Sequence, residues 1–176
     1  MSEPPEFRVP DVVGEAVGWR AWNVVGSRRV PRLMSINQAG MSVIHRDAVW
    51  PTTRWYVAQC PHGHTAGGHD DAVPHEGCAC GIYSARDREH LISLGYSAYG
   101  SGWSEPGSRL IVIGEVAYSG KVIPGAQGWK GQKARVKSLT VPYELWRWAK
   151  PLGEAYRVPA TVGFLFADHE REGSLR

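Results

Sequence analysis

The sequence predicts an α+β fold made mainly of antiparallel β-sheet, or of a partly open barrel, with two short helices and a metal-binding loop. The chain has 176 residues, among them 21 glycines and 12 prolines, which divide it into short segments. These segments are rich in β-branched and aromatic residues and lack the long 3.6-residue periodicity of a helical bundle. All three cysteines and four of the seven histidines fall in one Gly-rich stretch, 60–80.

The apolar and aromatic segments are predicted to be strands, because turn-forming residues bound them. The expected strands are 19–25, 32–36, 53–58, 81–83, 109–119 and 129–139. The first two flank a turn at 26–29 and should form a hairpin. The last two flank the Gly/Pro-containing loop 120–128 and should form a longer one, with 109–119 as the central, most apolar strand.

Two short helices are expected, over 85–94 and 141–150. Ser84 followed three residues later by Asp87 indicates the start of the first helix. Pro142 suits the first position of the second helix, which should end before Pro151.

Length and charge favour one globular domain over 11–167, between a flexible tail at 1–10 and a polar tail at 168–176. No segment has the length and apolar character of a signal peptide or a membrane span, so we expect a cytoplasmic protein without a membrane partner. The net charge of +3 permits a nucleic-acid partner without requiring one.

The stretch 60–80 has the composition of a metal site, since thiolates and imidazoles are the ligands that suit zinc. Cys78 and Cys80 are too close in sequence for a comfortable disulfide, which favours reduced thiolates. The expected ligand set is Cys60, His69, Cys78 and Cys80. Such a closed set would stabilise the fold and leave no position open for catalysis.

Other assignments of the stretch remain open. His62, His64 and His75 compete with His69 for the imidazole position. The histidines can instead be solvent-exposed loop residues, with the thiols acting as small buried hydrophobes.

An enzyme is the alternative interpretation. With only three protein ligands, a water could complete the metal, and Glu76, Asp70 or Asp71 could move its proton in a hydrolase or deaminase reaction. The string from His75 to Cys80 lacks the ligand spacing of a zinc deaminase, and no particular Cys/His nucleophilic pair stands out. Solubilising the loop is the simpler role for these carboxylates.

A basic strand is the second candidate site. Strand alternation places Lys133, Arg135 and Lys137 on one face and Ala134 and Val136 on the other. The full candidate surface for a nucleic-acid or protein partner is Lys121, Trp129, Lys130, Lys133, Arg135 and Lys137. Lysines on a solvated strand face also discourage edge-to-edge aggregation, which is the simpler explanation.

Two pairs of tryptophans cannot share one core face. Trp19 and Trp22 are three residues apart on a strand and so point to opposite faces. Trp146 and Trp148 are two apart on a helix and point about 200° apart. One member of each pair can therefore meet another element, a ligand or a partner.

A series of short motifs runs through most of the chain: Gly18-Trp19-Arg20-x-Trp22, Leu33-x-Ser35, Trp50-Pro51, Ala58-x-Cys60, His69, Pro74, Cys78-x-Cys80-Gly81-Ile82-Tyr83, Gly114-Glu115-Val116-Ala117, Gly120-Lys121-Val122-Ile123 and Gly128-Trp129-Lys130. In these motifs the chain resembles a family of short uncharacterised proteins from actinobacteria and their phages. The resemblance covers roughly 18–160 and brings no established activity. It implies a phage-encoded modulator of a host protein.

These observations together favour a zinc-stabilised binding or adaptor module over an enzyme. The expected partner is a host protein or a nucleic acid. One fold can support many functions, so the function is inferred from the candidate sites.

Overall fold

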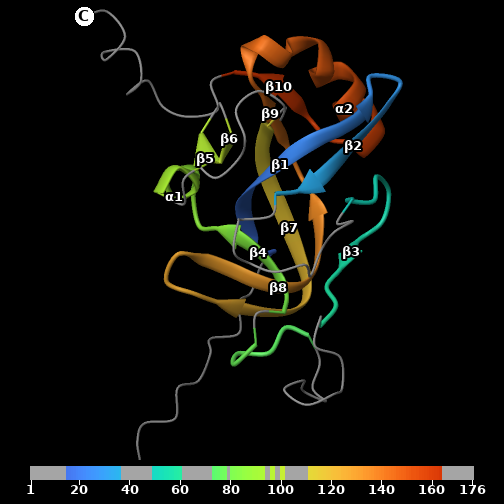
Figure 1. Ribbon diagram of the computed structural model, residues 1–176. Coiled ribbons are helices and arrows are strands. Elements are labelled where there is room, and N and C mark those ends of the chain that lie inside the picture. Colours follow the sequence, from blue (N-terminus) through green and yellow to red (C-terminus); the bar gives the residue numbers. More distant parts are fainter. Residues whose placement is uncertain are drawn as a thin grey trace, which may run out of the picture.

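A closed ring of four antiparallel strands forms the centre of the molecule (Figure 1). The computed structural model describes residues 15–36, 49–60, 73–78, 80–93, 96–97, 100–101 and 111–163. The strands of the ring are β1 (Val17–Ser27), β4 (Ile82–Ala85), β8 (Gly128–Val136) and β7 (Ile111–Pro124). Each pairs with the next, and pairing of β7 with β8 closes the ring. The predicted α+β, mainly antiparallel class is confirmed.

The first predicted hairpin is confirmed. β1 pairs antiparallel with β2 (Val30–Ser35), from Trp22 opposite Ser35 to Ser27 opposite Val30. The tight connection requires glycine at position 26, where φ is +84° and a Cβ would lie 2.5 Å from the Val30 carbonyl oxygen. A left-handed backbone with so close an approach admits only glycine without strain.

The second predicted hairpin is also present, but its loop is much shorter than 120–128. β7 continues to Pro124, and only residues 125–127 connect it to β8. A register shift between Ser119 and Val122, with Gly120 at φ +77°, absorbs the glycine inside the strand. Glycine thus makes a bulge here instead of a loop, which a single sequence does not distinguish.

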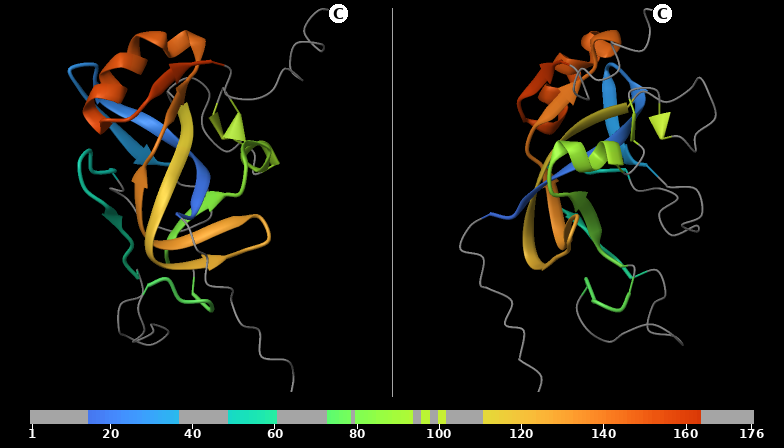
Figure 2. Two further views of the ribbon diagram at one scale, coloured as in Figure 1. Left: turned by 180° about the vertical axis from the view of Figure 1, so that it is seen from behind. Right: turned by 90° about the vertical axis from the view of Figure 1, so that its left-hand side faces the viewer.

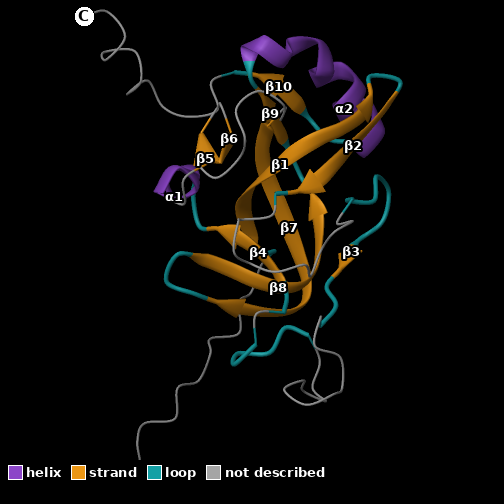
Figure 3. Cartoon of the chain, viewed as in Figure 1, coloured by secondary structure: helices purple, strands orange, loops and turns teal. Residues whose placement is uncertain are grey.

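Further strands extend the ring on both sides (Figure 3). β9 (Leu139–Val141) pairs antiparallel with β7 and parallel with β10 (Ala160–Val162), which was not predicted. β3 (Tyr56–Val57) pairs with β8, and a separate two-stranded sheet joins β5 (Tyr96–Ser97) to β6 (Gly100–Ser101).

The first predicted helix starts later than expected. Ser84 belongs to β4, and α1 covers only Arg88–Ser93. Asp87 caps it, because the His90 backbone N–H donates to Asp87 Oδ1 at 2.9 Å. The predicted helix start at Ser84 is therefore wrong, and Asp87 is the residue that caps the helix.

The second predicted helix is wrong at both ends. Residue 141 ends β9, and the helical segment begins as the 3-10 helix η1 (Tyr143–Trp148) and continues as α2 (Ala149–Tyr156). Pro151 is the third residue of α2, in a first turn whose N–H groups lack α-helical partners anyway, so proline does not stop the helix. α2 ends at Tyr156, and the residue that follows, Arg157, adopts φ +55°.

The core lies on two faces of the sheet. Trp22 is fully buried in the larger cluster, whereas Trp19 packs against the smaller cluster formed by residues such as Ala21 and Ile113. The prediction that Trp19 and Trp22 face opposite ways is confirmed. Trp22 meets Trp50 edge to face, with ring centroids 5.3 Å apart, a favourable aromatic geometry.

The helical segment covers one end of the barrel, at the top of Figure 1 and in both views of Figure 2. Tyr156 of α2 ties it to the strands, because its hydroxyl accepts a hydrogen bond from the Leu33 N–H (2.7 Å) and donates to the Trp50 carbonyl oxygen (3.0 Å). On η1, Trp146 is 58% exposed while Trp148 packs against the core. The prediction that these two rings point apart is confirmed.

The expected tails, 1–10 and 168–176, lie outside the described residues. Within the described part of the chain, no helix has the length and apolar character needed to cross a membrane.

We predict that Tyr118 makes the fold sensitive to alkali. Burial raises the pKa of Tyr118 to about 12, while tyrosine in an unfolded chain ionises near pH 10. Folding thus favours the neutral phenol, and its stabilisation is complete below pH 10 and lost as the pH rises through 12. Between pH 8 and pH 11 the wild type should lose about 1 kcal/mol more unfolding free energy than Tyr118→Phe, measured by denaturant titration.

Tyr118→Phe also removes the hydrogen bond to the Ile82 carbonyl oxygen (3.2 Å), which costs about 1 kcal/mol at either pH. The pH-dependent difference between the two proteins is therefore the relevant quantity. Equal losses in both proteins would contradict the prediction.

Candidate metal centre

The three cysteines meet at the end of the barrel opposite α2 (Figure 1). Cys60 follows β3, whereas Cys78 and Cys80 precede β4. β3 and β4 both pair with β8, so the sheet register brings the two cysteine-bearing segments together. Cys60 thereby lies next to Cys78 and Cys80, which follow it by 18 and 20 residues in the sequence.

The three sulfur atoms have the spacing of metal ligands. All three Sγ atoms lie within 4.8 Å of one another, and those of Cys60 and Cys78 are 3.8 Å apart. Sulfurs bound at about 2.3 Å to a tetrahedral ion are separated by about 3.8 Å, whereas a disulfide requires about 2.05 Å. The cluster is therefore positioned to bind a metal ion and is not a disulfide.

A cation would stabilise the deprotonated state of the three cysteines. Burial raises the pKa of the Cys80 thiol, the hydrogen bond from the His75 backbone N–H (3.4 Å) lowers it, and the neighbouring thiols of Cys78 and Cys60 raise it again. Three thiolates at this spacing repel one another, so the deprotonated state needs a positive charge among them. A bound metal ion supplies that charge.

Lys130 holds the loop that carries Cys78. Its Nζ donates to the carbonyl oxygens of His75 (2.7 Å) and Cys78 (3.1 Å), and lies 3.5 Å from that of Glu76. Gly81 allows this approach, because at φ +122° a Cβ would lie 2.6 Å from Lys130 Cγ. The sequence placed Lys130 on the basic strand surface, but the structure turns it toward the cysteine loop.

The identity of a fourth ligand stays a prediction. His69 lies outside the described residues, as do the competing His62 and His64 and the carboxylates of Asp70 and Asp71. Of the described residues, only the three cysteines form the ligand cluster, and neither His75 nor Glu76 belongs to it. His75 Nδ1 instead accepts a hydrogen bond from the Gly77 N–H (3.2 Å).

The basic strand alternates as expected. Ala134 and Val136 are buried, Lys133 is half-buried, and Arg135 and Lys137 are exposed. The predicted two faces of β8 are therefore confirmed.

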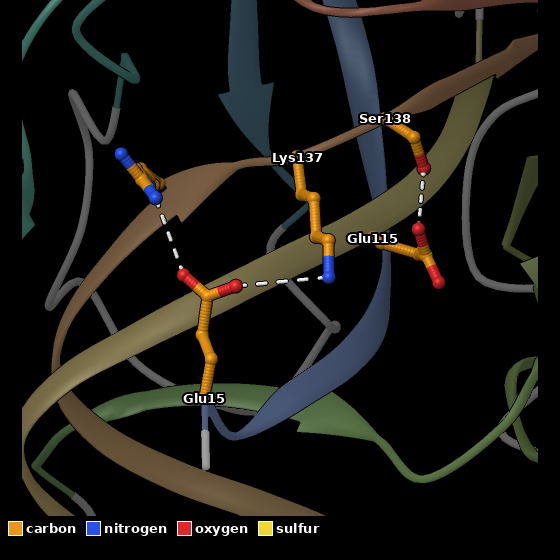
Figure 4. A network of polar contacts seen from close by, with 5 residues as sticks. Glu15, Glu115, Lys137 and Ser138 are labelled. Carbon is orange, nitrogen blue, oxygen red and sulfur yellow. Dashed lines mark hydrogen bonds and ion pairs between the residues drawn. The ribbon is translucent and has the colours of Figure 1, made fainter.

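Glu15 reduces the positive charge of that strand. One carboxylate oxygen lies 3.2 Å from Arg135 Nη2 and the other lies 3.6 Å from Lys137 Nζ, as Figure 4 shows for Lys137. Arg135 also stacks over the Trp55 ring at 4.8 Å. Sequence reasoning missed Glu15 and Trp55, because each meets the strand only through long-range folding.

The remaining two residues of the predicted surface, Trp129 and Lys121, differ in exposure. Trp129 is half-buried and packs against the larger core cluster, so only part of its side chain is exposed. Lys121 is exposed at the bulge of β7. Further along β7, Glu115 accepts a hydrogen bond from the Ser138 hydroxyl at 2.9 Å, which fixes the bend between β8 and β9 (Figure 4).

No family model, no curated protein and no solved structure matches this chain.

We predict that Lys130 stabilises the metal-bound loop. Lys130→Met keeps the aliphatic stem but removes the donor to three carbonyl oxygens, and loss of such outer contacts typically weakens metal binding about 10- to 100-fold. Competition with a chromophoric chelator measures the affinity. Lys133→Met, the same change on the same strand, serves as the control and should bind metal as the wild type does. Equal affinities for all three proteins would show that Lys130 does not support the site.

Proposed function

We propose that this chain is a zinc-stabilised binding module. The observation that supports the zinc site is the cluster of Cys60, Cys78 and Cys80, whose sulfur atoms lie within 4.8 Å of one another. Three thiolates select a soft or borderline ion, and zinc is the common one that requires no redox chemistry.

We propose His69 as the fourth ligand, completing the set Cys60, His69, Cys78 and Cys80. A set of four protein ligands closes the coordination sphere, so the ion serves the fold. The position of the cysteine cluster in the sheet suits an ion that stabilises the fold. β3 has two residues and β4 has four, and such short strands gain little from backbone pairing alone. Zinc would join the end of β3 to the start of β4.

The partner that we propose is a protein, docked on the outer face of η1. Trp146 and Tyr143 are 58% and 55% exposed, and the Arg147 guanidinium lies 5.2 Å from the centre of the Trp146 ring. Tryptophan, tyrosine and arginine are the residue types that dominate interface energetics. The resemblance to proteins of actinobacteria and their phages makes a host protein the expected partner, with the module as its modulator.

A nucleic acid is the second candidate, favoured by the exposed Lys121 and by Lys133, which forms no ion pair with another described residue. The contacts of Glu15 with Arg135 and Lys137 count against it, because a carboxylate in the middle of the strip repels phosphates. We therefore rank a protein partner first.

An enzyme with an open metal position is the remaining alternative. The described residues supply three ligands, which is the number in many catalytic zinc sites. No described carboxylate joins the cluster to act as a base, so the structural role is preferred.

We predict about one zinc per chain in protein purified without a histidine tag, measured by mass spectrometry. Chelation should lower the melting temperature sharply, because zinc at about 1,000 times its Kd contributes about 4 kcal/mol to stability. Cys80→Ser should unfold or melt at the temperature of the chelated protein. No metal and no shift on chelation would refute the zinc site.

Two histidine variants test the closed site. His69→Ala should weaken zinc binding, whereas His75→Ala, the matched control outside the cluster, should not. If His69→Ala binds zinc as tightly as the wild type, a water or another residue completes the coordination, and the enzyme alternative gains support.

We predict that the basic strand does not bind nucleic acid. Lys133→Glu combined with Arg135→Glu should elute from a single-stranded DNA column at low salt together with Arg28→Glu combined with Arg29→Glu, a control with the same charge change on the exposed β1–β2 turn. Earlier elution of the strand variant alone would make nucleic acid the favoured partner.

A further inference from the structure

A pocket of about 510 Å³ lies beside β1, β4 and the tip of the β7–β8 hairpin, with Leu91 of α1 among its lining residues. Small-molecule sites typically measure about 300–1,000 Å³. The volume therefore suits a small organic ligand.

Three aromatic residues line the pocket: Trp19, Tyr83 and Trp129. Aliphatic side chains such as Ile36 and Ile123 complete a mainly apolar wall. Flat rings favour offset or edge-on contact with another ring. The wall is thus suited to a flat, apolar ligand body.

The charged residues in the described part of the wall are both cations. Arg20 and Lys130 line the pocket, and none of the described wall residues is acidic. Arg20 donates to the Tyr83 carbonyl oxygen and to the Ser35 hydroxyl (3.0 Å), and Lys130 donates to backbone carbonyl oxygens. These partners are neutral, as is the Trp50 ring that lies 5.4 Å from the Arg20 guanidinium, so no described carboxylate pairs with either cation. Beside an apolar wall, they attract an anion more strongly than they would in water.

Two N–H groups of the wall residues also lack an acceptor. Arg20 Nε and Trp129 Nε1 are buried without a hydrogen-bond partner in the described part of the chain. Buried donors in this state are unfavourable. If either side chain turned toward a ligand oxygen, its N–H group would gain an acceptor and that cost would be relieved. The expected ligand therefore carries a hydrogen-bond acceptor.

We propose that this pocket binds a flat aromatic carboxylate. The ring would lie against the aromatic wall, and the carboxylate would face Arg20 and Lys130. This inference goes beyond the proposed docking function, and it assigns the chain a small-molecule site next to the loop that carries Cys78.

Calorimetry with naphthoate and its neutral analogue naphthamide tests the proposal on zinc-loaded, folded protein. Naphthoate should bind at least tenfold more tightly than naphthamide, because the two differ only in the charged group. Ile123→Trp, which fills the pocket, should abolish binding, whereas Val162→Trp on β10 should not. Arg20→Gln should lower naphthoate affinity about tenfold and leave naphthamide unchanged.

Absence of naphthoate binding would overturn the proposal, as would equal affinity for both compounds or unchanged binding by Ile123→Trp. If Arg20→Gln does not fold, the comparison of naphthoate with naphthamide and the Ile123→Trp variant still test the proposal. Metal content and chelation melts are measured on the same protein stock, so failure of the zinc site and failure of the pocket are separate outcomes.

Discussion

Closure of the four-stranded ring is the constraint on which the rest of the structure depends. β8 pairs with β7 on one side and with β4 and β3 on the other, so its register fixes where both cysteine-bearing segments lie. Closure also removes free edges from the central strands, which protects them from pairing with other chains. The long β7–β8 hairpin is local in sequence and can form early, whereas the pairs with β3 and β4 require contacts distant in the chain.

Lys130 links the two candidate sites. Its position on β8 is set by pairing with Tyr83 and Ile123, and its ammonium group binds the carbonyl oxygens of the cysteine loop while its stem lines the pocket. A single side chain therefore holds the cysteine loop in place and adds a positive charge to the wall of the pocket.

The charge pattern of β8 shows how folding changes the charge of a strand that resembles a binding surface in the sequence. Lys133, Arg135 and Lys137 share a face, as period-two alternation requires. Folding brings Glu15 from the start of β1 against two of them and Trp55 against one. The exposed face of η1, with Trp146 stacked against Arg147, has no such compensation by a described carboxylate and keeps a large apolar surface in water. These contacts are the reason for ranking a protein partner above a nucleic acid.

The sequence by itself determined the strand-rich class, the two hairpins, the opposed faces of Trp19 and Trp22 and the gathering of potential metal ligands in 60–80, because these follow from local periodicity and ligand chemistry. It misplaced the helix boundaries and the β7–β8 loop, since glycine in a bulge and proline in a first helical turn look like breaks in a linear pattern. Only the tertiary structure decided the parallel pairing of β10, the role of Lys130, the neutralisation by Glu15 and the pocket. Each of these joins residues far apart in the chain, and side-chain direction at that range depends on barrel closure, which no local pattern encodes.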